Sequence, residues 1–239
     1  MELQGSGALI TGGSRGLGAA LGRELARRGS RVVLVARRRP ELDAVVDEIR
    51  REGGQAHALA ADVGDKQAIH RLAGAAAALV GPVDLLVHNA SALGPTPLRP
   101  LLDTECEALE RVLAVNLVGP FRLTRALAGS MALRRRGLIV LVSSDAAVTP
   151  YPRWGAYGAS KAALEQLGRI WAEELRPAGV DVLVVDPGEM DTDMHAAAMP
   201  EAERAALARP AEVAARLADR LAAAAVSSGA RLELAAVPS

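Results

Sequence analysis

Tyr157 and Lys161 are the two residues of this chain whose types and spacing point most directly to chemistry. They stand four apart in the segment YGASK, and Lys161 is one of only two lysines in a chain that otherwise uses arginine. A lysine ammonium can hydrogen-bond a sugar and favours the ionised form of a nearby phenol. If residues 155–175 are helical, the spacing places the two side chains on one face, with Cβ atoms about 5–6 Å apart. We therefore predict that Lys161 lowers the pKa of Tyr157 from its ordinary value of about 10, so that the phenol can act as an acid or base.

Ser144 is the next candidate, because it ends the apolar run GLIVLVSS thirteen residues before Tyr157. The run predicts a buried strand, and the carboxyl ends of strands in an open α/β sheet form the edge where ligands bind. A YxxxK pattern also occurs by chance on solvated helix faces. Its interpretation therefore depends on the elements that position it.

Short β-branched apolar runs alternate with longer stretches of helical periodicity, which is typical of βαβ units and a parallel sheet. The predicted strands are 7–11, 31–36, 55–61, 83–88, 138–143, 181–186 and 231–235. The predicted helices are 16–28, 40–52, 66–80, 103–132, 155–176 and 210–224. No linker or repeat divides them, so we expect one domain over residues 1–239, with a small substrate lid near 189–209.

Composition excludes several classes of function. The formal charge is zero and arginines are interspersed with acids, which argues against nucleic-acid binding. The chain has no long apolar segment and a single cysteine, Cys106, so we expect a cytoplasmic protein without membrane spans or disulfides. No histidine and carboxylate cluster predicts a metal site; His57 and His70 are read as surface groups, and His195 lies near the predicted lid.

The segment TGGSRGLG follows the first predicted strand and opens a helix. Glycines at 12, 16 and 18 would allow a tight turn, close approach of the backbone to a pyrophosphate and close helix packing. A nucleoside-triphosphate loop is disfavoured because no GK[ST] follows. We predict a dinucleotide site whose loop residues are Gly12, Ser14, Arg15, Gly16, Leu17 and Gly18.

The end of the second predicted strand bears on which dinucleotide is bound. An acid there would bind the ribose 2′-hydroxyl of NAD, whereas arginine accommodates the 2′-phosphate of NADP. Ala36 stands at that place and Arg37 follows it, and Arg15 can approach the same phosphate. We predict NADP(H) in preference to NAD(H). The alternative is that residues 37–39 form a solvated turn, which is our interpretation of Arg38 and Arg39.

Taken together, TGGSRGLG, Asp62-Val63, HNAS, Asn116 in AVNLVG, Ser144, YGASK and PGEMDT resemble the short-chain dehydrogenase/reductase family over residues 5–235. The resemblance implies one doubly wound Rossmann-type domain, with seven parallel strands in the order 3-2-1-4-5-6-7 and helices on both faces. It implies hydride transfer between a nicotinamide and a carbonyl or alcohol. By the same resemblance, the catalytic residues are Ser144, Tyr157, Lys161 and Asn116, and the further cofactor-binding residues are Asp62, Val63, Asn89, Ala90, Pro187, Gly188 and Thr192, with Tyr157 and Lys161 shared.

Two positions depart from the family pattern, since His88 and Ser91 replace residues of the usual NNAG. The chain also ends without the glycine-rich tail of many members, although the resemblance still implies a homodimer or homotetramer. The substrate-contacting residues are expected to include Leu93, Tyr151, Trp154 and Met194.

The sequence leaves three functions open. A reductase of free ketones or aldehydes is the leading interpretation, and a 3-oxoacyl thioester reductase is the alternative within the same class. A dinucleotide-sensing regulator without catalysis is disfavoured, because Ser144, Tyr157 and Lys161 are all present.

Overall fold

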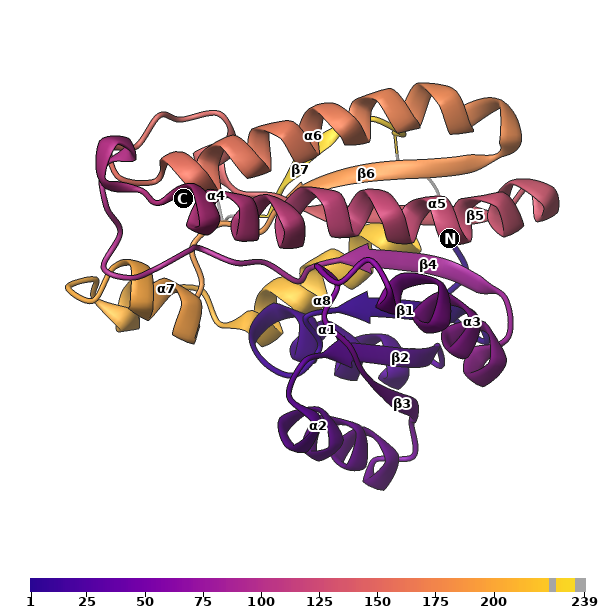
Figure 1. Cartoon of the computed structure of the whole chain (residues 1–239). Helices are drawn as coiled ribbons and strands as arrows, with labels where there is room; N and C mark the ends of the chain where they lie inside the picture. Colours follow the sequence, from indigo (N-terminus) through magenta and orange to yellow (C-terminus); the bar gives the residue numbers. More distant parts are fainter. Residues whose placement is uncertain (224–226, 235–239) are drawn as a thin grey trace.

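The computed structural model describes residues 1–223 and 227–234, and its centre is one seven-stranded sheet with helices on both faces (Figure 1). Every pair of neighbouring strands is parallel, and the strand order is β3-β2-β1-β4-β5-β6-β7. The strand order reverses between β1 and β4, where adjacent strands connect to helices on opposite faces. The strands are β1 (Gly7–Thr11), β2 (Arg31–Ala36), β3 (Gln55–Ala60), β4 (Val83–His88), β5 (Gly137–Val142), β6 (Val180–Asp186) and β7 (Arg231–Glu233).

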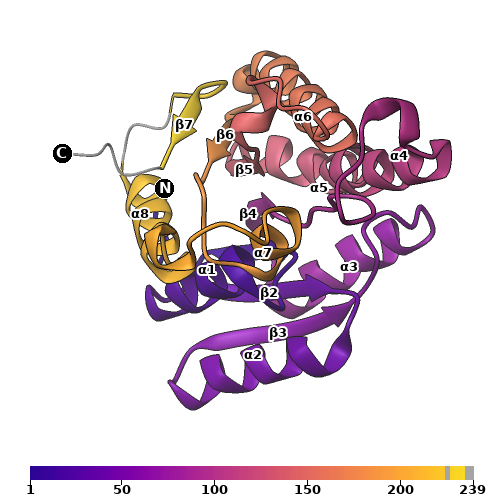
Figure 2. The same ribbon diagram turned by 90° about the vertical axis from the view of Figure 1, so that its left-hand side faces the viewer.

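The helices cover the two faces of this sheet in two groups (Figure 2). On one face α1, α2 and α8 bury residues such as Leu25, Leu42 and Leu217, and on the other α3, α5 and α6 bury residues such as Ile69 and Leu123. The helices are α1 (Gly16–Arg27), α2 (Arg39–Arg51), α3 (Ala68–Val80), α4 (Cys106–Leu113), α5 (Gly119–Arg134), α6 (Gly155–Leu175), α7 (Asp193–Ala198) and α8 (Pro210–Ala222). Shorter helical turns are η1 (Leu101–Asp103), η2 (Ala114–Val118), η3 (Asp145–Ala147), η4 (Arg176–Ala178) and η5 (Arg204–Ala206).

Continuous apolar runs form the central strands because both of their faces are covered. In β1, Leu9 belongs to one core cluster and its neighbours Ala8 and Ile10 to the other, as the alternation of side chains along a strand requires. The predicted fold class and strand order are therefore confirmed. Strand ends agree with the prediction to within one residue up to β6, and positions 224 and 235 of the predicted last helix and strand lie outside the described residues.

The prediction of a helical segment near 103–132 is confirmed except at its start, since residues 106–134 are helical throughout in the structure. The structure divides this segment into η1, α4, η2 and α5, and η2 is a π-helical turn. Pro120 has no amide hydrogen to donate to the Asn116 carbonyl four residues earlier. The Gly119 amide instead bonds to the Ala114 carbonyl, five residues back. The Gly119-Pro120 pair was thus the sequence signal for this interruption, and it leaves Asn116 in a locally unwound turn.

The short helix α7 lies between β6 and α8, within the segment predicted as a lid, and it had not been predicted as a helix. Thr192 caps it by accepting a hydrogen bond from the His195 amide at 3.2 Å. No helix among the described residues is both long and apolar enough to span a bilayer.

We expect Gly168→Ala to destabilise the fold by about 1–3 kcal/mol, because overpacking a filled interface forces side chains to move. A Cβ atom at Gly168 of α6 would lie 2.5 Å from Leu141 Cδ1 and 3.2 Å from Val184 Cγ2 in the sheet. The matched control is Gly129→Ala in α5, where an added Cβ meets nothing within 4 Å. Urea unfolding should show that variant to be unchanged or stabilised by up to about 1 kcal/mol. Equal stability of the two variants would contradict the close packing of α6.

Candidate active site

One cavity of about 1280 Å³ lies at the carboxyl ends of the strands and extends from the glycine loop to the amino-terminal part of α6. The volume exceeds the roughly 300–1,000 Å³ typical of sites for small ligands, so a dinucleotide and a second molecule can share it. Its walls contain all the predicted site residues except Gly18 and Asn116. Those present are Gly12, Ser14, Arg15, Gly16, Leu17, Arg37, Asp62, Val63, Asn89, Ala90, Leu93, Ser144, Tyr151, Trp154, Tyr157, Lys161, Pro187, Gly188, Thr192 and Met194.

The glycine loop is fixed against the end of β4 by Asn89. Its amide Nδ2 donates to the Thr11 carbonyl at 3.0 Å and to the Gly12 carbonyl at 3.1 Å. Gly12 has a φ of 71°, and a Cβ atom there would lie 2.9 Å from the Ala90 backbone. A Cβ at Gly18 would lie 2.3 Å from the Gly12 carbonyl oxygen. Gly18 therefore serves the packing of α1 under the loop and does not face the cavity.

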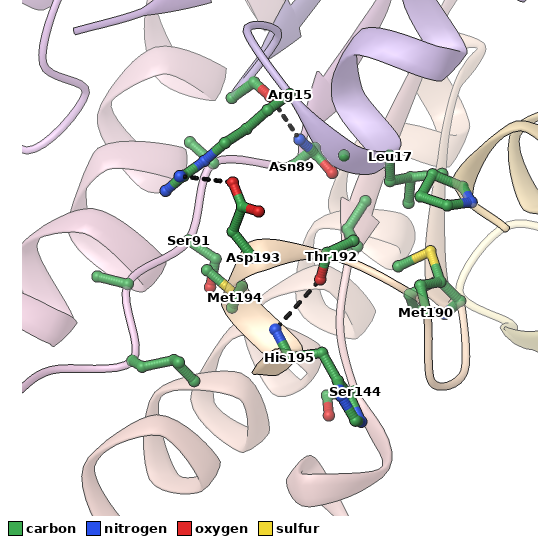
Figure 3. Close-up of a pocket in the computed structure, with 18 of the residues that line it drawn as sticks. Arg15, Leu17, Asn89, Ser91, Ser144, Met190, Thr192, Asp193, Met194 and His195 are labelled. Atoms are coloured by element: carbon green, nitrogen blue, oxygen red, sulfur yellow. Dashed lines mark hydrogen bonds and ion pairs between the residues drawn. The ribbon is translucent and has the colours of Figure 1, made fainter. Parts of the chain in front are cut away.

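The glycine loop also contacts the segment that contains α7, as Figure 3 shows. Arg15 and Asp193 form an ion pair of 3.1 Å across the cavity, and both side chains are largely exposed. Ion pairs between exposed groups are weak and are easily exchanged for other charged partners. Arg15, predicted to approach a cofactor phosphate, thus has a protein carboxylate as its partner here.

Ser144, Tyr157 and Lys161 converge on the other end of the cavity. Lys161 is fully buried, and its Nζ donates to the Val142 carbonyl at 2.7 Å, at the end of β5. The ammonium also lies 5.5 Å from the centroid of the Tyr157 ring. The i, i+4 spacing of α6 therefore places the amine and the phenol on one face, as predicted.

The predicted direction of the Tyr157 pKa shift is wrong. Burial raises the pKa of Tyr157 to about 12, and this outweighs the hydroxyls of Ser144 and Ser91, which act to lower it. Burial also lowers the pKa of Lys161 to about 8, although Asp186 and Glu165 oppose that shift. In both groups burial disfavours the ionised form, which loses hydration inside the protein, but with a pKa of about 8 Lys161 still holds its proton at neutral pH.

Asp145 is a site residue that the sequence interpretation missed. Its carboxylate accepts the Ser144 hydroxyl at 2.8 Å and, through its other oxygen, the Tyr151 hydroxyl at 2.8 Å. The signal was local, since Asp145 directly follows Ser144 and both it and Tyr151 belong to one loop. In this arrangement the Ser144 hydroxyl donates its hydrogen to Asp145, so the Ser144 oxygen can only accept hydrogen bonds from other groups.

Asn116 lies behind the cavity and is almost fully buried. Its Oδ1 accepts the Ala92 amide at 2.7 Å, and its Nδ2 donates to the Ala92 carbonyl and to Ser160 Oγ, each at 2.9 Å. Ser91 Oγ also donates to Oδ1 at 3.3 Å. The side chain of Asn116 therefore ties the loop after β4 to α6.

Comparison with protein families and known proteins identifies the family of this chain. A family model described as short chain dehydrogenase matches residues 6–203. The chain belongs to the short-chain dehydrogenase family. This is a family of oxidoreductases that use a nicotinamide cofactor and act on small molecules.

Relatives of this family member include a short chain dehydrogenase of Pseudocercospora fijiensis, 40% identical over 198 residues. The match covers 82% of this chain and 63% of that protein, so this chain corresponds to less than two thirds of that relative. The 2,3-dihydro-2,3-dihydroxybenzoate dehydrogenase of Bacillus subtilis is 36% identical over 193 residues, 81% of this chain and 73% of its own length. A metagenomic short-chain oxidoreductase in complex with NADP has a TM-score of 0.80 and 36% identity, with 94% of each chain covered.

His88, one of the two departures in the HNAS segment of this short-chain dehydrogenase, is a buried structural residue. Its Nε2 lies 2.8 Å from Thr124 Oγ1 in α5, and the side chain does not line the cavity. Burial lowers the pKa of His88 to about 3. Between pH 6.5 and about 3, the His88 imidazole therefore stays neutral in the folded protein, whereas the same side chain binds a proton in the unfolded chain.

We expect His88 to make the fold acid-sensitive. Its pKa is depressed in the folded state, so the unfolded chain binds the additional proton and stability falls as the pH drops from 6.5 towards 3. The contribution is about 1.4 kcal/mol for each pH unit in that window. Urea unfolding at pH 7 and pH 5 measures it, and His88→Asn should show a smaller loss between the two. An identical loss in wild type and variant would contradict this role.

Proposed function

We propose that this chain is an NADP(H)-dependent reductase that converts a ketone or an aldehyde to the alcohol. The observation that supports it is the placement of Ser144, Tyr157 and Lys161 in the same cavity as the glycine loop. A protein that only sensed the dinucleotide would not require a proton-donating phenol at this place. The proposal extends the family membership to a reaction direction and a cofactor.

The loop and the start of α1 fit the phosphates of a dinucleotide. Gly12 and Gly16 have φ values of 71° and 54°, and the former has no room for a side chain. The first turn of α1 contains no acidic residue, and no side chain caps its amino terminus. The amide hydrogens there, together with the helix dipole, favour a bound phosphate.

When bound, the nicotinamide supplies the hydride; the chain supplies the proton and the geometry. Because burial raises the pKa of Tyr157 to about 12, the phenol holds its proton at neutral pH and can give it to a developing alkoxide. Ser144 would hydrogen-bond the same oxygen once its proton turns away from Asp145. Lys161 would hold the ribose and return a proton to Tyr157, since its pKa near 8 lets it release one readily.

The remaining proposed roles concern the walls of the cavity. We assign the far end of the cavity to substrate, where Leu93, Tyr151, Trp154 and Met194 supply mostly apolar surface. Residues 189–209 would act as the lid, since Met190, Met194 and Met199 of this segment line the cavity. The residues of the cavity and the lid would belong to a single domain that spans the chain.

We also propose a homo-oligomer. Large apolar side chains remain exposed on η1, α5 and α6, where Leu102, Leu133 and Ile170 are 100%, 89% and 45% accessible. The assignment rests on the family resemblance, and these side chains mark where α5 and α6 would be covered by another subunit. Sedimentation of the full chain as a monomer at micromolar concentration would overturn this assignment.

The function is tested by NADPH consumption with ketones, aldehydes and 3-oxoacyl thioesters. We expect turnover with at least one ketone or aldehyde, and Tyr157→Phe should lose it by about 10²–10⁴-fold because the proton donor is gone. NADPH affinity, measured by fluorescence titration, should stay within about threefold in this variant, since the ring and its packing remain.

Tyr151→Phe is the comparison variant, because Tyr151 is the only other tyrosine and lines the same cavity. Since Tyr151 is assigned to substrate contact and bonds Asp145, its loss should change KM more than kcat, whereas Tyr157→Phe should lose kcat. Equal rates in wild type and Tyr157→Phe would remove the mechanism. Turnover of 3-oxoacyl thioesters alone would assign the alternative substrate class, and no turnover at all with intact NADPH binding would favour a sensor.

The NADP preference is supported by Arg37, which lines the cavity directly after Ala36. Arg38 and Arg39 form exposed ion pairs with Glu41 and Asp43, at 2.7 Å each. Within residues 1–223 and 227–234, the Arg37 side chain has no ion-pair partner. The related metagenomic oxidoreductase was solved with NADP.

We expect Arg37→Asp to weaken NADPH binding by at least about tenfold and NADH binding much less, because one charge-assisted contact with phosphate is worth about 1.5–3 kcal/mol. Fluorescence titration with both cofactors measures the ratio. Arg39→Asp is the matched control, since it makes the same charge change outside the cavity. Undiminished preference for NADPH in Arg37→Asp would contradict the assignment.

A further inference from the structure

Arg231 of β7 lies between two buried carboxylates behind the catalytic end of the cavity. Its Nε is 3.1 Å from Glu165 Oε1, and its Nη2 is 2.7 Å from Asp186 Oδ2. The side chains of Arg231, Glu165 and Asp186 are 18%, 2% and 9% exposed. Charges this far from water interact more strongly than surface pairs.

These two carboxylates flank Lys161. Glu165 follows Lys161 by one turn of α6, and Asp186, at the end of β6, lines the cavity together with Lys161. Both act to raise the pKa of Lys161, in opposition to its burial. With Arg169 beside Glu165 and Glu233 beside Arg231, the ammonium, the guanidinium and the two carboxylates belong to a cluster of three positive and three negative groups.

The same cluster is hydrogen-bonded to the segments that follow β5 and β6, where residues of the site lie. Glu165 Oε1 accepts the Ser143 hydroxyl at 2.7 Å, and Asp186 Oδ1 accepts the Gly188 amide at 3.0 Å. Arg231 Nη2 also lies 3.4 Å from the Ser144 carbonyl oxygen. The last strand is therefore joined to the loop of the catalytic serine and to the Pro187-Gly188 turn.

We propose that Arg231 is a positioning residue of the active site: its guanidinium neutralises Glu165 and Asp186 and so sets how firmly Lys161 holds its proton. The effect of Arg231 on catalysis rests on the proposed function, whereas its effect on proton binding by Lys161 does not. No feature of the sequence singled out Arg231, Glu165 or Asp186, which lie on three different elements.

The direction of the effect follows from the charges that face Lys161 and Tyr157. Glu165 in α6 and Asp186 in β6 act on Lys161, and Asp145 in the loop after β5 and Asp186 act on Tyr157. Arg231 in β7 acts through Glu165 and Asp186 and also pairs with the exposed Glu233, while Arg169 lies 3.5 Å from Glu165. Removing the guanidinium leaves the carboxylates uncompensated. Lys161 would then bind its proton more tightly and return it to Tyr157 less readily.

The test is the titration of Lys161 in the full chain by NMR with isotope-labelled lysine. The chain has only two lysines, so Lys66 on the surface provides an internal reference. We expect Arg231→Met to raise the pKa of Lys161 by about 1 unit or more, as expected for a lost neighbouring charge. Arg231→Lys should restore most of the wild-type value, and Arg231→Met combined with Glu165→Gln should return towards it because neutrality is regained.

Glu165→Gln alone keeps the proposal testable if Arg231→Met does not fold. It should lower the pKa of Lys161, the opposite direction to loss of the arginine. A Lys161 titration that is the same in wild type and in Arg231→Met, or that fails to move in Glu165→Gln, overturns the proposal.

The catalytic consequence has its own readout. With an active substrate, Arg231→Met should lower kcat and move the apparent pKa of alcohol oxidation to higher pH, with little change in NADPH affinity. A purely structural role would lower kcat without moving that pKa. Absence of turnover in the wild type would count against the proposed function and would leave the lysine titration to decide the role of Arg231.

Discussion

The Lys161 side chain crosses from α6 to the end of β5, where its ammonium donates to the Val142 carbonyl and faces the ring of Tyr157. It is fully buried, and a buried ammonium persists only where carbonyl oxygens and carboxylates compensate for its lost hydration. The Val142 carbonyl and the carboxylates of Glu165 and Asp186 meet this requirement. The ends of β5 and β6 and one face of α6 must stay in register for the ammonium to be held.

The parallel sheet makes that convergence possible. All strands point the same way, so the residues that follow them meet at one edge although they are far apart in the chain. Two separate apolar cores, one on each face, hold the strands in order. Polar groups are confined to the edge, where Asn89 joins the glycine loop to β4 and Asn116 joins the next loop to α6.

Electrostatics divides the cavity into two ends. Arg15 and Arg37 lie at one end of the cavity, whereas Asp145, Asp186, Tyr157 and Lys161 lie at the other. Burial raises the pKa of the phenol to about 12. This suits a site that delivers a proton to a carbonyl oxygen at neutral pH.

The sequence by itself determined the α/β class, because apolar periodicity is a local signal, and its ordered motifs, through their resemblance to the family, added the strand order and most residues around the cavity. Tertiary structure decided the rest. The protonation of Tyr157 depends on its burial, and the Glu165, Asp186 and Arg231 cluster depends on contacts among α6, β6 and β7. Desolvation and charge pairing depend on which groups meet in space, and no local pattern records that for residues 45 or 66 positions apart.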